Sequence, residues 1–204
     1  DHPLAQVAPI DDLDRIVLPV WNEHYASGNV LYPLIASGIL SCGSTPLIRK
    51  SCIERVGGYD ETLTLAEDWK FYTALAGECD FEVIPECLTG YRIRGDSSSV
   101  QVEPMEAALE QCTQWIRQTW PGTPEIVFRE RAFTIETYLA FMSIRARRYG
   151  AVPQYLWRAA RVKPAALLGL SIWELALLSI AHAAGLRRYE WALWRKPKRF
   201  ESGL

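Results

Sequence analysis

Two adjacent carboxylates, Glu67 and Asp68, stand beside Trp69 at the start of a stretch with apolar residues at helical spacing. Carboxylates in the first turn of a helix are stabilised by the positive end of the helix dipole. A carboxylate held there, after a glycine-bearing turn, is also placed to take a proton from a hydroxyl nucleophile, as a general base does. The spacing alone favours the capping role over the catalytic one.

A second cluster combines arginine with serine. Arg92 and Arg94 lie two residues apart, so both occupy one face of a strand expected over residues 88–94, and Ser97 follows in a polar loop. Guanidinium groups suit bidentate contacts with phosphate oxygens, to which serine hydroxyls and loop amides add. The alternative is a surface strand whose arginines are solvated.

The elements that must position these groups follow from composition and periodicity. Gly43 and Ser44 belong to a turn of small residues, where the backbone can approach a ligand closely. Gly57 and Gly58 permit positive φ angles and should end the helical turns before them. Strands are expected over 15–20, 45–49, 80–85 and 88–94, a short helix broken near Pro33 over 29–36, and helices over 50–56, 67–77 (closed by Gly77) and 103–120.

From residue 124 onwards the pattern is helical, with segments over 125–149, 152–162 and 165–185. Residues 145–204 contain twelve Lys and Arg against three Asp and Glu, whereas residues 1–144 contain ten against twenty-one. A basic tail on an acidic body suggests an anionic partner for the tail, such as phospholipid. Nucleic acid has little support, because no recognisable binding module is present.

The apolar run over 165–185 has three open interpretations. It is just long enough to span a bilayer, and it also fits an interfacial helix or a packed core helix. Glu174 in the middle of the run favours the last two, because a carboxylate at the bilayer centre is costly. Trp191, Trp194 and several basic residues after the run fit an interface.

Composition places the chain among ordinary folded proteins, with 49% apolar and 23% charged residues. Its 204 residues allow one domain, or a small domain with an appendage. The five cysteines form no C-x-x-C pair, which indicates neither a zinc site nor a disulfide framework and favours a reducing compartment. Cys79 and Cys87 either pair across a hairpin or remain free thiols.

Several of these motifs occur in an order that resembles the second half of a family 2 glycosyltransferase. The resemblance covers roughly residues 29–100, about a third of the chain. It is carried by Leu47–Lys50 (LIRK), Val56–Glu61 (VGGYDE), Glu67–Trp69 (EDW), Tyr91-Arg92 and the serines at 97–99.

The resemblance implies an α/β fold of the glycosyltransferase-A type. Residues 1–122 would form its acceptor-side half, and residues 123–204 a helical, basic, Trp-rich extension. The implied reaction transfers a sugar from a nucleotide-diphosphate sugar to an acceptor hydroxyl. The residues that match the family's motifs imply Asp68 as the base, Glu67 and Trp69 at the acceptor, and Arg92 and Ser97 at the donor diphosphate. We also expect Gly43 and Ser44, in the turn of small residues, at the acceptor, and Arg94, on the same strand face as Arg92, at the diphosphate.

Two departures from the family pattern limit this expectation. The D-x-D motif that would hold Mg²⁺ or Mn²⁺ is not found, and Asp12-Leu13-Asp14 is interpreted as a loop because no nucleotide-binding segment precedes it. Arg94 stands where the family often has His. We therefore expect a divalent metal only in a complete enzyme, with ligands outside this chain. The chain alone should neither bind a sugar nucleotide tightly nor turn over.

The resulting hypothesis is an enzyme of cell-envelope glycan synthesis, with a glycan or lipid-linked acceptor. The helical extension would dock on the inner face of the cell membrane, which makes the protein cytoplasmic and peripheral. The alternative is a non-catalytic membrane-binding or partner-binding module that lacks the donor site. A purely structural helical scaffold is a third interpretation.

Overall fold

A computed structural model describes residues 27–37, 45–82, 101–168 and 170–185 of the chain, and most of these residues are helical. Two short strands, β1 (Ser27–Gly28) and β2 (Phe81–Glu82), pair antiparallel, with Ser27 opposite Glu82 and Gly28 opposite Phe81. The helices are α1 (Leu31–Ser37), α2 (Lys50–Val56), α3 (Glu67–Glu78), α4 (Val102–Thr119), α5 (Glu125–Arg145), η4 (Tyr149–Ala151), α6 (Val152–Val162), η5 (Pro164–Leu168) and α7 (Leu170–Ala183).

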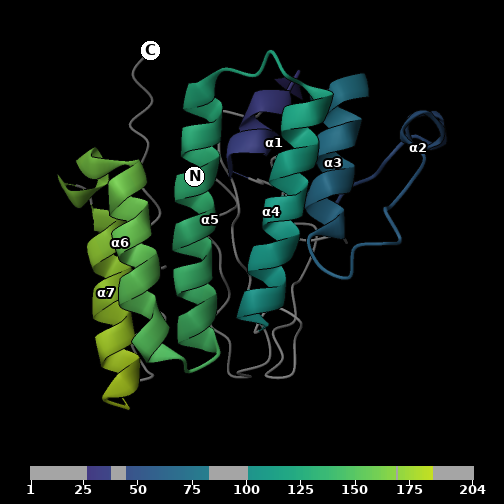
Figure 1. The fold of residues 1–204 in the computed structure, drawn as a ribbon. Coiled ribbons are helices and arrows are strands. Elements are labelled where there is room, and N and C mark those ends of the chain that lie inside the picture. The colour runs from purple at the N-terminus through teal and green to yellow at the C-terminus, as the bar shows by residue number, and fades with distance from the viewer. Residues whose placement is uncertain (1–26, 38–44, 83–100, 169, 186–204) are drawn as a thin grey trace, which may run out of the picture.

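Helix α5 is the centre of this arrangement and contacts α1, α4, α6 and α7. Figure 1 shows the long helices standing side by side, with α6 and α7 on one flank of α5 and α3 on the other side of α4. Helix α1 packs against both α3 and α5, and α2 contacts α3. Helix α2 projects at the edge of the molecule, beyond α3 (Figure 1).

The hydrophobic core joins both sides of the domain boundary expected near residue 122. Its largest cluster includes Leu65 before α3, Leu109 in α4 and Leu139 in α5, all buried. Burying each such side chain stabilises the fold by about 1.5–3 kcal/mol. A smaller cluster joins α1, α4 and α5 through Ile35, Ile116 and Phe128. The described residues on the two sides of this boundary contribute to the same core. The division into two domains stays a prediction.

The predicted α/β class is not confirmed by the described residues, which are mostly helical with almost no strand. The strand predicted over 45–49 is wrong: Pro46 has no amide donor, and Leu47 is fully exposed. Of the strand predicted over 80–85, the structure describes β2 (Phe81–Glu82), and residues 83–85 lie outside the described residues. Those expected over 15–20 and 88–94 lie outside the described residues. The helical content agrees with the predicted helical extension.

The helices predicted over 50–56, 67–77, 103–120 and 152–162 are confirmed to within one residue at each end. Pro33 does not break α1, because it is the third residue of that helix, where the amide would have no intrahelical partner. Gly77 does not close α3, which continues to Glu78. A Cβ on Gly77 would come within 2.6 Å of Cζ2 of Trp120, so this position requires close approach.

The C-terminal helices differ from the predicted ones. Helix α5 ends at Arg145, and Arg147 beyond it has a positive φ of 57°. The single helix expected over 165–185 is divided into η5 and α7. Helix α7 buries Ile172, Leu178 and His182 against the bundle. Within the residues that the structure describes, no helix has the length and apolar character needed to cross a membrane.

Candidate active site at the start of α3

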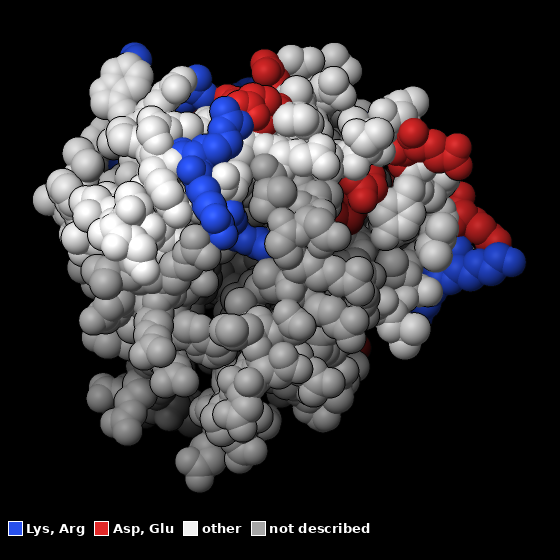
Figure 2. Space-filling model, turned by 90° about the horizontal axis from the view of Figure 1, so that it is seen from below, with Lys and Arg blue, Asp and Glu red and all other residues white. Residues whose placement is uncertain are grey.

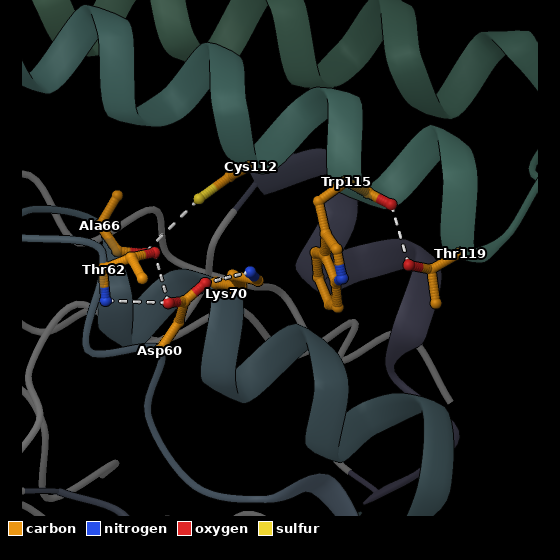
Figure 3. A network of polar contacts seen from close by, with 7 residues as sticks. All are labelled: Asp60, Thr62, Ala66, Lys70, Cys112, Trp115 and Thr119. Carbon is orange, nitrogen blue, oxygen red and sulfur yellow. Dashed lines mark hydrogen bonds and ion pairs between the residues drawn. The ribbon is translucent and has the colours of Figure 1, made fainter.

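The loop between α2 and α3 is held in place by Asp60. Gly57 and Gly58 each have a φ of 84°, and the Gly57 amide donates to the Ile53 carbonyl at 2.9 Å, which ends α2. The Asp60 carboxylate then accepts hydrogen bonds from the Thr62 amide (3.0 Å) and hydroxyl (2.6 Å), and it forms an ion pair with Lys70 of α3 (Figure 3).

These contacts fix the charge of Asp60. The hydrogen bond from Lys70, followed by those from Thr62, holds the pKa of the Asp60 carboxyl well below its ordinary value. The Lys70 ammonium also lies 5.0 Å from the ring centroid of Trp115 on α4. Asp60 is therefore an anchor that ties the loop to the end of the first turn of α3, and its charge is already neutralised.

The N-cap residue of α3 provides no side-chain cap. Ala66, at the N-cap position, has a φ of 57°, and its carbonyl accepts hydrogen bonds from the Lys70 amide at 3.1 Å and the Cys112 thiol at 3.7 Å (Figure 3). Positive φ is uncommon for a residue other than glycine. The turn is held in place because Ala66 itself and the preceding Leu65 are buried in the core.

Asp68 occupies the open first turn of α3. Its Oδ1 accepts a hydrogen bond from the Trp69 amide at 2.7 Å, so the carboxylate contributes to capping the helix as the spacing predicts. Burial raises the pKa of Asp68, the Trp69 amide opposes this rise, and the negative charge of Glu67 adds to it. Among the described residues, no side chain donates a hydrogen bond to this carboxylate.

Trp69 is fixed by the two elements on which it packs. Its indole Nε1 donates to the Leu34 carbonyl at 2.9 Å, and the Arg131 guanidinium lies 4.4 Å from the ring centroid. Arg131 also donates to the Ile35 carbonyl at 3.1 Å. Leu34 and Ile35 stand in the last turn of α1, whose carbonyls lack intrahelical partners. Trp69 and Arg131 together therefore cap the C-terminal end of α1.

Arg131 supports this site but was not among the residues predicted from the sequence. Its side chain is fully buried, with further bonds to the Thr113 hydroxyl (2.7 Å) and the Leu109 carbonyl (3.4 Å). Burial lowers its pKa to about 10. Its spacing carries a signal, because Arg131 lies three residues after the buried Phe128 and therefore on the same face of α5.

The predicted donor-side and turn residues lie outside the described residues. These are Gly43, Ser44, Arg92, Arg94 and Ser97, together with the Asp12–Asp14 string. Of the predicted site, the structure describes Glu67, Asp68 and Trp69 at the start of α3. Where the chain is described, no three His, Cys, Asp or Glu side chains converge as a metal site would require.

A second group of ionisable side chains lies where α4, α5 and α6 meet. Glu106 accepts hydrogen bonds from the Tyr155 hydroxyl (2.9 Å) and from Arg158 (2.6 Å). Arg158 also lies 3.9 Å from Oε2 of Glu136, which is an ion-pair distance without a hydrogen bond. Burial raises the pKa of Glu136 to about 7, and burial with the Glu106 hydrogen bond raises that of Tyr155 to about 12.

The described surface carries both signs of charge. On the face shown in Figure 2, the described basic and acidic side chains form small groups, some of which lie next to one another. Several of the ion pairs are exposed, such as Arg117 with Glu125, at 3.2 Å. Exposed pairs of this kind contribute little to stability.

Comparison with known proteins adds no assignment to these observations. No protein-family model matches the chain, and no curated protein or solved structure matches it significantly. The resemblance of residues 29–100 to a glycosyltransferase family therefore rests on the ordered motifs alone.

Proposed function

We propose that this chain is the acceptor-side part of a glycosyltransferase. The enzyme would transfer a sugar from a nucleotide-diphosphate sugar to an acceptor hydroxyl, in the synthesis of a cell-envelope glycan. The proposal includes an α/β fold of the glycosyltransferase-A type for the complete enzyme, with Asp68 as general base.

The observation that carries the proposal is the environment of Asp68. The carboxylate sits in the open first turn of α3, where burial raises its pKa and no described side chain donates to it. A carboxylate with a raised pKa is a stronger base than an exposed one. Asp60, eight residues earlier, is instead neutralised by Lys70. Of the two aspartates that flank this loop, only Asp68 has the character that proton abstraction needs.

The chemical step assigns one role to this chain. Asp68 takes the proton of the acceptor hydroxyl while the hydroxyl oxygen attacks the anomeric carbon of the donor sugar, and the nucleoside diphosphate leaves with the electrons of the broken bond. Glu67, beside Asp68, contributes negative charge that keeps the base basic. Trp69, held by Leu34 and Arg131, keeps the first turn of α3 in position. The roles of Gly43, Ser44, Arg92, Arg94 and Ser97 at acceptor and donor remain part of the proposal.

The test is Asp68→Asn in the complete enzyme, with kcat measured at saturating donor and acceptor. Asparagine keeps the shape and the hydrogen bond from the Trp69 amide but cannot take a proton. We expect kcat to fall by roughly 10²–10⁴. The matched control is Glu136→Gln, which removes another buried carboxylate with a raised pKa and should leave kcat near the wild-type value. A near-normal kcat for Asp68→Asn would contradict the proposal.

The outer face of α7 favours a second candidate function, docking on a membrane surface. Trp173, Leu177 and Ile180 stand at helical spacing and are 53%, 61% and 66% exposed, while the opposite face packs in the bundle. Helix α7 lies within residues 145–204, which contain twelve Lys and Arg against three Asp and Glu, and an apolar helix face with Trp in a basic region is typical of helices that lie in the interface of an anionic membrane.

Vesicle flotation tests this docking with the full chain. We expect flotation with vesicles that contain anionic phospholipid and weaker flotation with neutral ones. The variant Leu177→Ser with Ile180→Ser should lose most of the bound fraction. Equal flotation of the variant and the wild-type chain would reject the α7 face as the docking surface, and would leave the transfer chemistry untouched.

A further inference from the structure

Cys52 and Cys79 meet at the contact between α2 and the end of α3, with one arginine between them. The Arg55 Nη2 atom lies 2.7 Å from the Cys79 sulfur and 3.3 Å from the Cys52 sulfur. Both cysteines are free and half-buried. Two sulfurs that share one donor atom lie close enough for modest side-chain rotations to bring them into bonding distance.

The surrounding contacts hold this arrangement. Arg55 also donates to the Glu78 carbonyl at 3.4 Å, in the last turn of α3. Cys79 is the C-cap residue of α3, and its amide donates to the Leu75 carbonyl at 2.8 Å. Cys52 packs at the edge of the cluster that contains Leu75. The position of both thiols is therefore set by the α2–α3 contact.

We propose that Cys52 and Cys79 form an oxidisable dithiol, a modification site at which peroxide produces a reversible disulfide between α2 and α3. The proposal stands independently of the transfer chemistry at Asp68. Cys79 is the attacking sulfur, because it lies nearer to the guanidinium, and Cys52 is the resolving sulfur.

The reaction has two balanced steps. The Cys79 thiolate attacks one oxygen of hydrogen peroxide, the O–O bond breaks, and the departing hydroxide takes a proton to become water, which leaves a sulfenic acid on Cys79. The Cys52 sulfur, after losing its proton, attacks the Cys79 sulfur, the S–O bond breaks, and a second water leaves. The two thiols lose two protons and two electrons, and the peroxide is reduced to two molecules of water.

Electrostatics supports this order of reaction. Hydrogen bonding with Cys79, then burial, raises the pKa of the Cys52 thiol, so Cys52 keeps its proton while Cys79 reacts. The hydrogen bond between Arg55 and Cys79 raises the pKa of Arg55, so the guanidinium stays charged beside the two sulfurs. A nearby Arg stabilises the thiolate, which is the reactive form. Cys112 differs, because burial raises its pKa and its thiol donates to a carbonyl inside the core.

The proposed disulfide would be a covalent cross-link beside the candidate active site. The disulfide would close a loop that contains Gly57, Gly58, Asp60 and Asp68. Such a cross-link reduces the freedom of that loop in the unfolded chain and so stabilises the fold. In a reducing compartment the bond would be transient, as regulatory disulfides are.

The test uses the full chain with Cys42→Ser and Cys87→Ser, which keeps Cys52, Cys79 and Cys112. After hydrogen peroxide, we expect two of the three thiols to be lost, and mass spectrometry without reduction should find the Cys52 and Cys79 peptides linked. Dithiothreitol should restore both thiols, and Cys112 should stay reduced throughout. Linkage through Cys112, separate sulfinic acids, or retention of all thiols would overturn the proposal.

Single variants test the role of each group. In Cys52→Ser, a sulfenic acid should accumulate on Cys79 and be trapped by a 1,3-diketone, whereas Cys79→Ser should react more slowly. Equal rates would reject Cys79 as the attacking sulfur. Arg55→Met should slow thiol loss roughly tenfold, because it removes the guanidinium that lies beside the Cys79 sulfur. An unchanged rate would reject the role of Arg55. Circular dichroism of each variant establishes that it is folded before oxidation.

Discussion

The start of α3 and the junction of α4, α5 and α6 each hold a half-buried carboxyl whose pKa is raised by burial, but their neighbours differ. At the junction, Glu136 faces Arg158, which also bonds Glu106. At the start of α3, Asp68 accepts a hydrogen bond from a backbone amide, and no cationic side chain among the described residues pairs with it. A raised pKa by itself therefore does not identify a catalytic group. The carboxyls at the junction belong to a network of side-chain contacts, whereas the Asp68 carboxylate receives no hydrogen bond from a described side chain.

Arg131 connects the two regions, and its loss should have the largest effect on stability. It lies on α5, one and a half turns before Glu136, and its guanidinium stacks on Trp69 and bonds the Ile35 carbonyl. Arg131→Met keeps most of the volume but leaves a buried carbonyl unpaired and removes the cation–π contact. We expect a loss of about 2–3 kcal/mol in the free energy of unfolding, measured by urea denaturation.

The matched control for that variant is Arg117→Met. Arg117 forms an exposed ion pair with Glu125 and also stacks on an aromatic ring, that of Phe128 at 3.8 Å. Its loss should cost less than about 1 kcal/mol. If the two variants unfold at similar urea concentrations, the buried guanidinium does not hold α1 against α3 and α5.

The effect of Glu136→Gln on the free energy of unfolding should depend on pH, and this dependence characterises the junction of α4, α5 and α6. The folded pKa of Glu136 is about 7, against an ordinary value of 4.5, so between these values the folded chain binds more protons than the unfolded chain. Stability contributed by the protonated group is present at pH 4 and is lost as the pH rises through 7. The amide cannot ionise, so we expect the variant to be about 1–2 kcal/mol more stable at pH 8 and little changed at pH 4.

Urea denaturation at both pH values measures this difference. Glu106→Gln is the control, because Glu106 accepts hydrogen bonds from Tyr155 and Arg158 and its loss should destabilise the chain. A Glu136→Gln curve that follows wild type at every pH would mean that Glu136 is solvated in the folded chain.

The sequence predicted the helices of this structure better than its strands. The 3.6-residue spacing of apolar residues in 103–120 and 152–162 is long enough to identify helices, and both are confirmed. A short apolar run such as 45–49 has too few residues to distinguish a strand from a loop, and there the prediction is wrong. Of the candidate site, the first turn of α3 was predicted from Glu67 and Asp68 because the apolar face follows at once.

The residues that support the site were not predictable in the same way. The contact of Lys70 with Asp60 joins positions ten residues apart, and that of Arg131 with Ile35 joins positions 96 apart. Such pairs depend on how the helices pack, which local periodicity does not encode. The division of 165–185 into η5 and α7 is not predictable from the sequence either, because apolar residues continue across the break and give no change in periodicity there.

The smallest expected effects distinguish the two aspartates around the loop, and they have opposite signs. Asp60 has a lowered folded pKa, so its stabilisation is present above the unfolded value near 3.8 and is lost as the pH falls through the folded value. Asp68 has a raised folded pKa, so its contribution is present below 3.8 and is lost as the pH rises through the folded value. At pH 7, Asp60→Asn should therefore lower the urea midpoint, and Asp68→Asn should raise it slightly.

The rise for Asp68→Asn should shrink as the pH is lowered to 4, because protonation makes the Asp68 carboxyl resemble its amide. The loss for Asp60→Asn should largely persist at pH 4, because the folded pKa of Asp60 lies well below that pH. The rise for Asp68→Asn should be smaller than that for Glu136→Gln, because the Trp69 amide already stabilises the Asp68 carboxylate in part. Urea midpoints of both variants and of wild type, compared at pH 7 and at pH 4 with equal m-values, measure these differences. A lowered midpoint for Asp68→Asn at pH 7 would mean that its charge chiefly caps α3, and Asp68 would then lose the physical argument for its role as a base.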